Sequence, residues 1–291
     1  MRETAKRSND AEYTESDRYS RDGFVLRRQL FDIDIISEAV NWFRKQDQSA
    51  LAKSWTEQEP GVPLAVFSVV HQGGNPFANL VTDDRILTVA SQLVGKPTYL
   101  WASKVNVKAA WCGTAEYYHQ DRVYMQDRGY PNDDMLSCMI FLERHWISNA
   151  ALHVFPGTHR LGFIPHRPFI NVNGLAKQMI PPESLQRLYK DHGLVVIEAE
   201  PGDALFFHTS LVHGSSHNIS PHGRMILLAQ INTVGNEPCE VSARARKFNL
   251  ARAKMEYDEA CRRHRYFKEK YQAQESSEDL VFGPPIPDHE R

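Results

Sequence analysis

This sequence has little of what marks an exported, membrane-bound or zinc-binding protein. Its four cysteines, Cys112, Cys138, Cys239 and Cys261, lie far apart and form no Cys-x-x-Cys pair. This spacing favours reduced thiols over a disulfide framework or a zinc site. The N-terminal residues lack the apolar stretch of a secretory signal, and no apolar run approaches the roughly 20 residues that span a bilayer. We therefore expect a soluble, cytoplasmic protein with no membrane partner.

The chain also lacks a strong charge of either sign, since 34 basic and 36 acidic residues leave a formal net charge of -2. A protein that binds nucleic acid mainly through its overall charge carries an excess of positive charge, so we expect no nucleic-acid partner. The 291 residues, 42% of them hydrophobic, suffice for one large core. We expect a single domain, and composition leaves the oligomeric state open.

Short apolar runs of β type follow one another through the middle of the chain, separated by turn residues. The predicted strands are 23–27, 98–108, 115–119, 135–142, 152–155, 194–198, 204–207 and 224–232. Helices are predicted after Asp32 or Asp34, at 83–94 and, as one interruption of the strand series, at about 173–191. This order predicts a mainly β protein with flanking helices (α+β) and a double-stranded β-helix core, a jelly roll of cupin type.

The ends of the chain are polar. Residues 1–18 are predicted to be a flexible tail, and the proline-rich residues 275–291 a second one. Between them lies one domain, 19–274, whose last part, 241–274, has no proline or glycine and predicts a C-terminal helix. Residues 57–77 contain several prolines and glycines and are predicted to be a long loop that acts as a lid.

Candidate metal ligands lie in two separate parts of the chain. His119 and Asp121 follow a predicted strand, and His213 lies far downstream. Two imidazoles and one carboxylate are the donors of a mononuclear non-haem Fe(II) oxygenase, because they leave one face of the ion open for co-substrate and O2. Four histidines compete for the downstream position. His213 is favoured because a turn of small residues follows it and permits close approach to an ion, and His208 remains an alternative ligand.

Arg224 begins the predicted strand that follows His213. Burying an arginine inside a barrel is costly unless an anion meets it. The planar guanidinium suits a carboxylate held by two parallel hydrogen bonds, so we expect Arg224 to bind the far carboxylate of a dicarboxylic co-substrate. The alternative is a structural arginine paired with an acidic residue of the protein.

These motifs together resemble the phytanoyl-CoA dioxygenase family of Fe(II)/2-oxoglutarate oxygenases. The matching segments are His119-Gln120-Asp121, Phe155-Pro-Gly-Thr-His159, Pro201-Gly-Asp-Ala-Leu-Phe-Phe207 and His213-Gly-Ser215 with Arg224. The resemblance extends from Tyr19 to Asn232, and the run Lys104-Val-Asn106-Val-Lys108 makes the spacing most similar to that of ectoine hydroxylase-like members. It implies Fe(II) held by His119, Asp121 and His213, and 2-oxoglutarate contacted by Arg224, Ser215 and Asn106.

The sequence departs from the family pattern at two places. The family's Asn-Gly-x-Leu is Asn149-Ala-Ala-Leu152 here, and the acidic residues often found at the end of the preceding strand are replaced by Glu143-Arg-His-Trp146. The carboxylate ligand that halogenases of this superfamily lack is present as Asp121. Hydroxylation or a related oxidation is therefore expected rather than halogenation.

The expected activity is oxidation of an unactivated C–H bond in a small, polar metabolite or natural-product intermediate, with O2 as co-substrate and conversion of 2-oxoglutarate to succinate. Substrate contacts are expected from the residues Lys104, Arg122, Gln126 and Asp127, the last three of which lie in a predicted lid loop, 122–130. Two alternatives are a non-catalytic jelly-roll scaffold and a hydroxylase of protein or nucleic acid, which the basic segment 241–274 keeps open.

Overall fold

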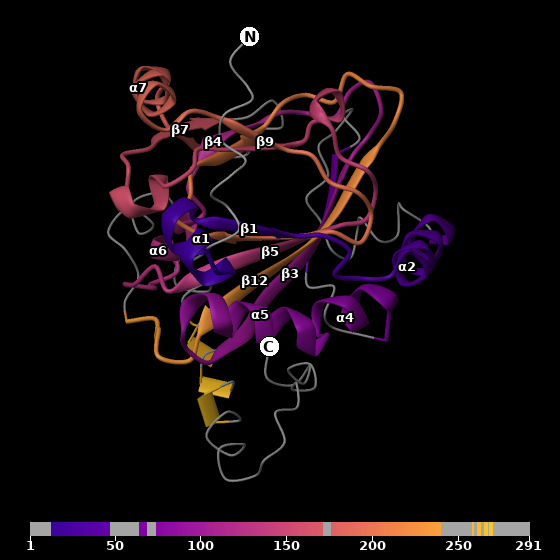
Figure 1. Cartoon of the computed structure of the whole chain (residues 1–291), viewed down its shortest axis with the longest axis horizontal. Coiled ribbons are helices and arrows are strands. Elements are labelled where there is room, and N and C mark those ends of the chain that lie inside the picture. The colour runs from indigo at the N-terminus through magenta and orange to yellow at the C-terminus, as the bar shows by residue number, and fades with distance from the viewer. Residues whose placement is uncertain are drawn as a thin grey trace.

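The computed structural model describes residues 13–46, 64–68, 74–170, 176–239 and single positions between 258 and 269. Two antiparallel sheets face each other, and α4 and α5 lie on the outside of the larger one (Figure 1). The larger sheet has the strand order β1-β10-β5-β12-β3-β2, and the smaller has the order β4-β11-β6-β9. The predicted jelly-roll core with flanking helices is confirmed.

The chain passes back and forth between the two sheets. The strands of the larger sheet are β1 (Phe24–Arg27), β2 (Leu64–Ser68), β3 (Thr98–Lys108), β5 (Met135–Phe141), β10 (Ala204–His208) and β12 (Arg224–Thr233). Those of the smaller sheet are β4 (Glu116–His119), β6 (Leu152–Val154), β9 (Val195–Ile197) and β11 (His213–Ser215). The strands β7 (Arg167–Ile170) and β8 (Ala176–Met179) form a separate hairpin.

Among the described helices, α1, α4 and α5 begin at residues whose side chains cap the first turn. The helices are α1 (Glu15–Asp22), α2 (Ile33–Lys45), α4 (Pro76–Val81), α5 (Asp84–Val94), α6 (Arg122–Asp127) and α7 (Pro182–His192), with short 3-10 turns at Ile147–Asn149 and Thr158–Leu161. Before α1, the Thr14 and Asp17 side chains each accept a hydrogen bond from the other residue's backbone N–H. After α1, Gly23 adopts φ 83° and donates its N–H to the Tyr19 carbonyl.

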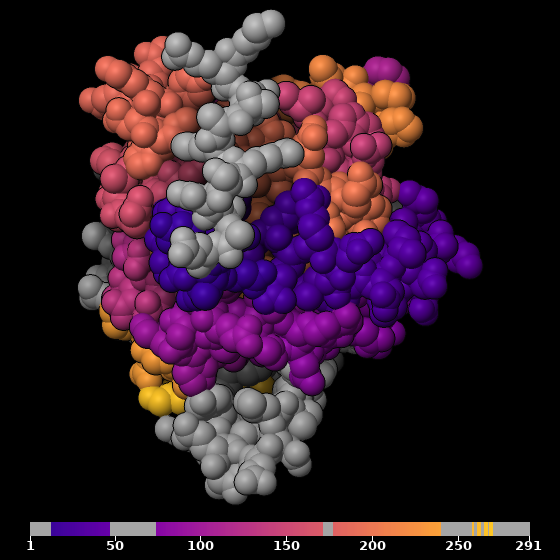
Figure 2. Space-filling view, in the orientation of Figure 1, coloured from indigo at the N-terminus to yellow at the C-terminus, as the bar shows by residue number. Residues whose placement is uncertain are grey.

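The larger sheet buries both of its faces. On the outer face, strand residues such as Ile140, Phe206 and Leu227 pack with α2, α4 and α5 through Phe43, Leu80, Ile86 and Val89. On the inner face, Phe141, Phe207 and Ile226 pack against the smaller sheet through Leu152, Val154 and Ile197. Figure 2 shows the outer layer in space-filling form, with the indigo N-terminal elements beside the purple band of α4 and α5. The inner face is therefore the space in which the smaller sheet can present functional side chains.

Two predicted segments were wrong in detail. The loop predicted at 57–77 contains β2 and, at Pro76, the beginning of α4, whose Asn75 cap accepts a hydrogen bond from the Ala78 N–H. The helix predicted at 173–191 covers β8 before α7 begins at Pro182. In both cases pairing with another strand, β3 for β2 and β7 for β8, determines the β structure, and the composition of the segment alone does not.

The predicted boundary between the N-terminal tail and the domain also differs from the structure. Helix α1 begins at Glu15, inside the tail predicted for 1–18, because the Thr14 cap and the burial of Tyr19 stabilise it. Most of the predicted helix 241–274 and all of the tail 275–291 lie outside the described residues, although the positions described between 258 and 269 are helical. No helix in the described ranges has the length and apolar character of a membrane span.

Candidate metal centre and co-substrate site

His119, Asp121 and His213 come together at the edge where the smaller sheet meets the chain that follows β4. His119 ends β4, His213 begins the neighbouring β11, and the two residues pair directly in the antiparallel register. Asp121 lies two residues beyond His119, at the start of α6. One donor atom from each of the three side chains lies within 4.8 Å of the others. The predicted ligand set is therefore brought into one place by the pairing of β4 with β11.

The two imidazoles are oriented by their own backbone. His119 Nδ1 lies 2.7 Å from the Tyr117 carbonyl, and His213 Nδ1 lies 2.9 Å from the Leu211 carbonyl. An Nδ1–H that donates to a carbonyl leaves the lone pair on Nε2. The Nε2 atoms lie 3.6 Å and 3.9 Å, respectively, from Asp121 Oδ1. Two imidazole nitrogens and one carboxylate oxygen therefore face one another, and this donor set fits a divalent iron ion.

The charge states suit such an ion. Burial alone raises the pKa of Asp121, but the hydrogen bond with His119 and the charge of His213 hold it below its ordinary value. Burial lowers the pKa of His213 to about 4, with a contribution from His119, so this imidazole is neutral at pH 7. Burial also opposes protonation of His119, yet Asp121 and Glu116 raise its pKa above the ordinary 6.5. A metal ion replaces that proton when it binds.

The alternative ligand His208 lies outside this cluster. Its Nδ1 accepts a hydrogen bond from the Ser210 N–H at 3.0 Å, and its ring lies beside those of Tyr19 and His159. The alternation of β10 places His208 on the outer side with Phe206, and the chain then turns before His213 enters the smaller sheet. Among the described residues, the metal-binding geometry includes only His213 from this part of the chain. This geometry agrees with the prediction that favoured His213, and His208 contributes none of the three grouped donor atoms.

The small residues that follow His213, expected to form a turn that lets an ion approach, belong instead to strand β11. Gly214 pairs with His153 on the neighbouring strand. A Cβ on this glycine would lie 2.9 Å from both the Glu116 carbonyl and the Tyr118 ring. Gly214 therefore allows β4 and its tyrosine to pack closely against β11.

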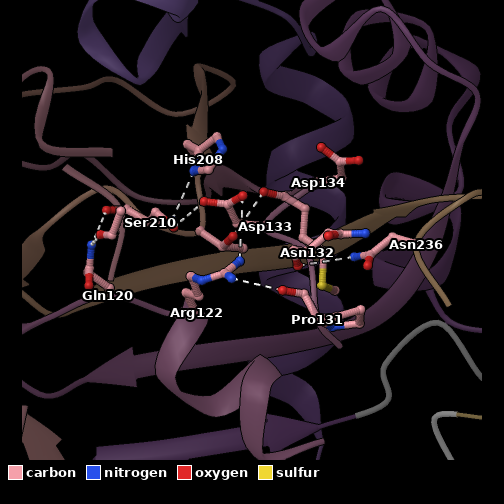
Figure 3. A network of polar contacts seen from close by, with 12 residues as sticks. Gln120, Arg122, Pro131, Asn132, Asp133, Asp134, His208, Ser210 and Asn236 are labelled. Carbon is pink, nitrogen blue, oxygen red and sulfur yellow. Dashed lines mark hydrogen bonds and ion pairs between the residues drawn. The ribbon is translucent and has the colours of Figure 1, made fainter. Parts of the chain in front are cut away.

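Gln120 lies between His119 and Asp121 and was not among the predicted site residues. Its fully buried carboxamide donates from Nε2 to the carbonyls of Gly162 and Ser210, at 2.8 Å and 2.7 Å, and accepts from the Ile164 N–H at 2.9 Å. Ser210 lies three residues before His213, and Figure 3 shows Gln120 beside it. Gln120 thus links the two parts of the metal-binding cluster. In the sequence, the position of this amide between two candidate ligands was the one available signal.

A second polar cluster surrounds Arg224, the first residue of β12. Arg224 is 3% exposed, and its guanidinium donates to the Ala150 carbonyl. Burial lowers its pKa to about 10, partly offset by Glu116. No acidic side chain within the described ranges forms an ion pair with it at 4.0 Å or less, which argues against the alternative of a structural arginine. A buried guanidinium in this state suits an incoming anion.

Lys108, which the predicted site residues did not include, adds a second buried cation beside Arg224. The two residues pair across β3 and β12, and Lys108 is 1% exposed. Its ammonium donates to Ser215 Oγ at 2.7 Å and to the Ser216 carbonyl at 3.0 Å. Asn106 lies two residues earlier on the same face of β3, and its Oδ1 is buried without a hydrogen-bond partner in the described part of the chain. The structure therefore groups Asn106 and Ser215 with these cations.

The φ of Ala150 shows how the chain accommodates one departure from the family pattern. Ala150 occupies the left-handed region, with φ 68°, where the family has glycine. Asn149 stabilises the turn by accepting from the Trp146 N–H and donating to the Arg144 carbonyl. The turn directs the Ala150 carbonyl to Arg224 despite the cost of this conformation for alanine, about 1 kcal/mol.

The predicted substrate contacts separate into two groups. Lys104 lies on the inner face of β3, where it pairs with the buried Leu228. The pKa of His213 is lowered by burial, by the charge of His119 and, to a smaller extent, by the charge of Lys104. Arg122 turns away from the cluster, toward Asp133 at 3.6 Å and the Pro131 carbonyl at 2.9 Å (Figure 3). The predicted loop that carries Arg122, Gln126 and Asp127 is the helix α6. Lys104 therefore lies near the metal ligands, and Arg122 does not point to them.

Comparison with known proteins agrees with this geometry. The family model described as phytanoyl-CoA dioxygenase (PhyH) matches residues 19–226. Ectoine dioxygenase from Streptomyces anulatus is 29% identical over 80% of this chain and 83% of its own, and L-proline trans-4-hydroxylase from Streptomyces griseoviridis is 31% identical over 76% of this chain and 86% of its own. The crystal structure of EctD from S. alaskensis with 2-oxoglutarate and 5-hydroxyectoine has a TM-score of 0.65 at 26% identity and covers 82% of each chain. This chain belongs to the phytanoyl-CoA dioxygenase family.

Proposed function

We propose that this protein is an Fe(II)- and 2-oxoglutarate-dependent dioxygenase that hydroxylates a C–H bond of a small, polar metabolite. The observation that carries the proposal is that one fold contains two sites. One is the cluster of His119, Asp121 and His213, and the other is the pair of buried cations Arg224 and Lys108. The names of the relatives support it, since they are an ectoine dioxygenase and a proline hydroxylase. A scaffold protein has no need of a buried cation pair beside a metal-binding cluster.

The residues of the two clusters have separate roles. His119, Asp121 and His213 would hold the iron, with their orientation kept by the Tyr117 and Leu211 carbonyls. Bound iron, with 2-oxoglutarate and O2, supplies oxidation of the C–H bond coupled to formation of succinate and CO2. Arg224 and Lys108 would bind the far carboxylate of 2-oxoglutarate, assisted by Asn106 and Ser215. The two packed sheets exclude water from this space.

The substrate is proposed to bind on the side of the metal cluster where Lys104 lies. An ammonium group on the inner face of β3 suits a substrate with a carboxylate or another polar group. Gln126 and Asp127 on α6 remain candidate contacts. The small net charge of -2 favours a metabolite over nucleic acid. The four free thiols fit the reducing cytoplasm, where we place the protein.

The first test is an anaerobic titration with Fe(II) in the presence of 2-oxoglutarate, followed by visible absorption. Chelation of the metal by a 2-oxo acid gives a weak charge-transfer band, which we expect in the native protein and in His208→Ala, and expect to be absent in His213→Ala. Succinate release from candidate substrates then identifies the reaction. A band that persists in His213→Ala and disappears in His208→Ala would overturn the ligand assignment, and no band in the native protein would overturn the proposed function.

A further inference from the structure

A buried histidine lies beside the Arg224 cluster without a role in the function proposed so far. His145 follows β5 and is 1% exposed. Its backbone forms an antiparallel bridge with Ala199, with His145 N–H donating to the Ala199 carbonyl at 2.8 Å and the Ala199 N–H donating back at 3.1 Å. The bridge holds His145 where the chain passes from the larger sheet to the edge of the smaller one.

Neither ring nitrogen of His145 has a hydrogen-bond partner within the described residues. Leaving a buried polar atom unpaired typically costs about 1–3 kcal/mol. Burial holds the pKa of His145 well below 6.5, with help from the charge of Arg224 and, less, from that of Lys108, and against an interaction with the Met225 backbone that falls short of hydrogen-bond geometry. The imidazole is therefore neutral at pH 7, and it keeps one N–H to donate.

The His145 ring faces the space between the sheets. It meets the Phe141 ring edge-on at 4.7 Å between centroids, and Phe141 belongs to the inner core. Across the sheet, Phe141 pairs with Ile226 and Ile226 pairs with Asn106. The next row on this face pairs Arg224 with Lys108. His145 thus lies at the same end of the inner face as the two buried cations.

Two other atoms at this end also lack partners. Arg224 Nε and Asn106 Oδ1 are buried without hydrogen-bond partners in the part of the chain that the structure describes. The unpaired donors of Arg224 and His145 in one region indicate a ligand that accepts hydrogen bonds from both, whereas Asn106 Oδ1 is an acceptor that an anion does not satisfy. Two of these residues offer donors beside two buried positive charges, so the ligand is expected to be an anion with several acceptor oxygens.

We propose that His145 is a third binding residue for the far carboxylate of 2-oxoglutarate, donating its N–H to an oxygen of the carboxylate that Arg224 and Lys108 hold. The proposal rests on the proposed function. A neutral donor suits this place, because a third cation would repel Arg224 and Lys108 while no ligand is bound. His145 belongs to the run Glu143–Trp146, where the sequence departs from the family pattern, so the contact would be a property of this chain.

The test compares two 2-oxo acids that differ only at the far end. Anaerobic Fe(II) protein is titrated with 2-oxoglutarate and with 2-oxovalerate, which has a methyl group in place of the far carboxylate. We expect His145→Leu to weaken 2-oxoglutarate about 10- to 100-fold, the loss of one hydrogen bond to a charged group, and to leave 2-oxovalerate within about twofold. His145→Gln retains an N–H donor and is expected to lose less.

The control is His192→Leu at the end of α7, whose ring contacts the Pro156 carbonyl and which should change neither affinity. Equal weakening of both acids in His145→Leu would show a merely structural role and overturn the proposal, as would an unchanged preference for 2-oxoglutarate. If His145→Leu does not fold, the same comparison in His145→Phe, which fills the space of the ring without a donor, decides. Failure of the native protein to bind 2-oxoglutarate with Fe(II) would instead overturn the proposed function.

Discussion

The two faces of the larger sheet are built from the same strands but differ in kind. The outer face packs against helices with apolar side chains such as Leu136, Ile140, Phe206 and Leu227. The inner face has apolar residues as well, but it also presents Lys104, Lys108 and Arg224 to the space between the sheets. Both faces are buried, so the contrast is not one of core against surface.

This contrast separates stability from chemistry. Burial of apolar side chains on the outer face is favourable without any ligand. Burial of Lys108 and Arg224 on the inner face costs free energy that an anion can recover. Alternating residues of one strand can therefore serve different purposes, and substitutions on the two faces should be distinguishable by experiment.

The largest expected effect comes from two neighbouring phenylalanines of β10. Phe206 points to the outer core, whereas Phe207 points inward and contacts the His213 ring at 5.0 Å between centroids. Phe206→Ala and Phe207→Ala should each lower the free energy of unfolding by about 3–5 kcal/mol in urea denaturation. Only Phe207→Ala should also weaken Fe(II) binding. Equal Fe(II) affinities in both variants would show that the faces are not functionally distinct.

Removal of a buried charge from the inner face should weaken ligand binding strongly without lowering the stability of the protein. Arg224→Met is expected to weaken 2-oxoglutarate binding at least about 100-fold, since it removes charge-assisted hydrogen bonds. The unliganded protein should be as stable as the native protein or more so, because the desolvation cost of the guanidinium is removed. The matched control is Arg144→Met, which removes an exposed arginine paired with Glu200 and should change neither quantity. Clear destabilisation by Arg224→Met would argue for a structural arginine.

His208, an ionisable group on the outer side, should make the stability of the protein depend on pH. Burial lowers its pKa to about 4, against opposition from Asp133, while the unfolded chain titrates near 6.5. Above pH 6.5 neither state is protonated and stability is unaffected. Between pH 6.5 and 4 only the unfolded state takes up the proton, so stability falls, by about 2 kcal/mol at pH 5.

This acid sensitivity is measured by urea denaturation of the metal-free protein at pH 7 and pH 5. His208→Gln should lose that part of the pH dependence, whereas the contribution of the other buried histidines should remain. An identical pH dependence in the native protein and in His208→Gln would show that His208 is already protonated or solvated in the folded state.

The smallest of these effects concerns Gln120, which connects the parts of the metal-binding cluster. Gln120→Leu removes the hydrogen bonds to Gly162, Ile164 and Ser210 and should weaken Fe(II) binding about 10- to 100-fold, as loss of a positioning residue typically does. Gln178→Leu on the β7–β8 hairpin is the control and should retain native affinity. A lower melting temperature with unchanged Fe(II) affinity would make Gln120 purely structural.

Strong local patterns made parts of the fold predictable. The strand Thr98–Lys108 and the helix Asp84–Val94 occur where the sequence predicts them, because apolar spacing and the Asp83 cap act over a few residues. The short strands β7 and β8 were missed, since they depend on pairing with each other across a turn. The predicted site residues His119, Asp121, His213 and Arg224 are chemically distinctive. Lys108 and Gln120 were missed because only their burial and neighbours reveal them, and the same holds for His145, whose role is proposed here.

The sequence by itself determined the donor types, the strand alternation and the turns, all of which depend on residues close together in the chain. The tertiary structure decided which histidine joins the cluster, because the pairing of β11 with β4 places His213 opposite His119 while the alternation of β10 sends His208 to the other side. It also decided that Arg224 pairs with Lys108 and lies near His145. Register and face are properties of pairing between distant segments, so no local pattern specifies them.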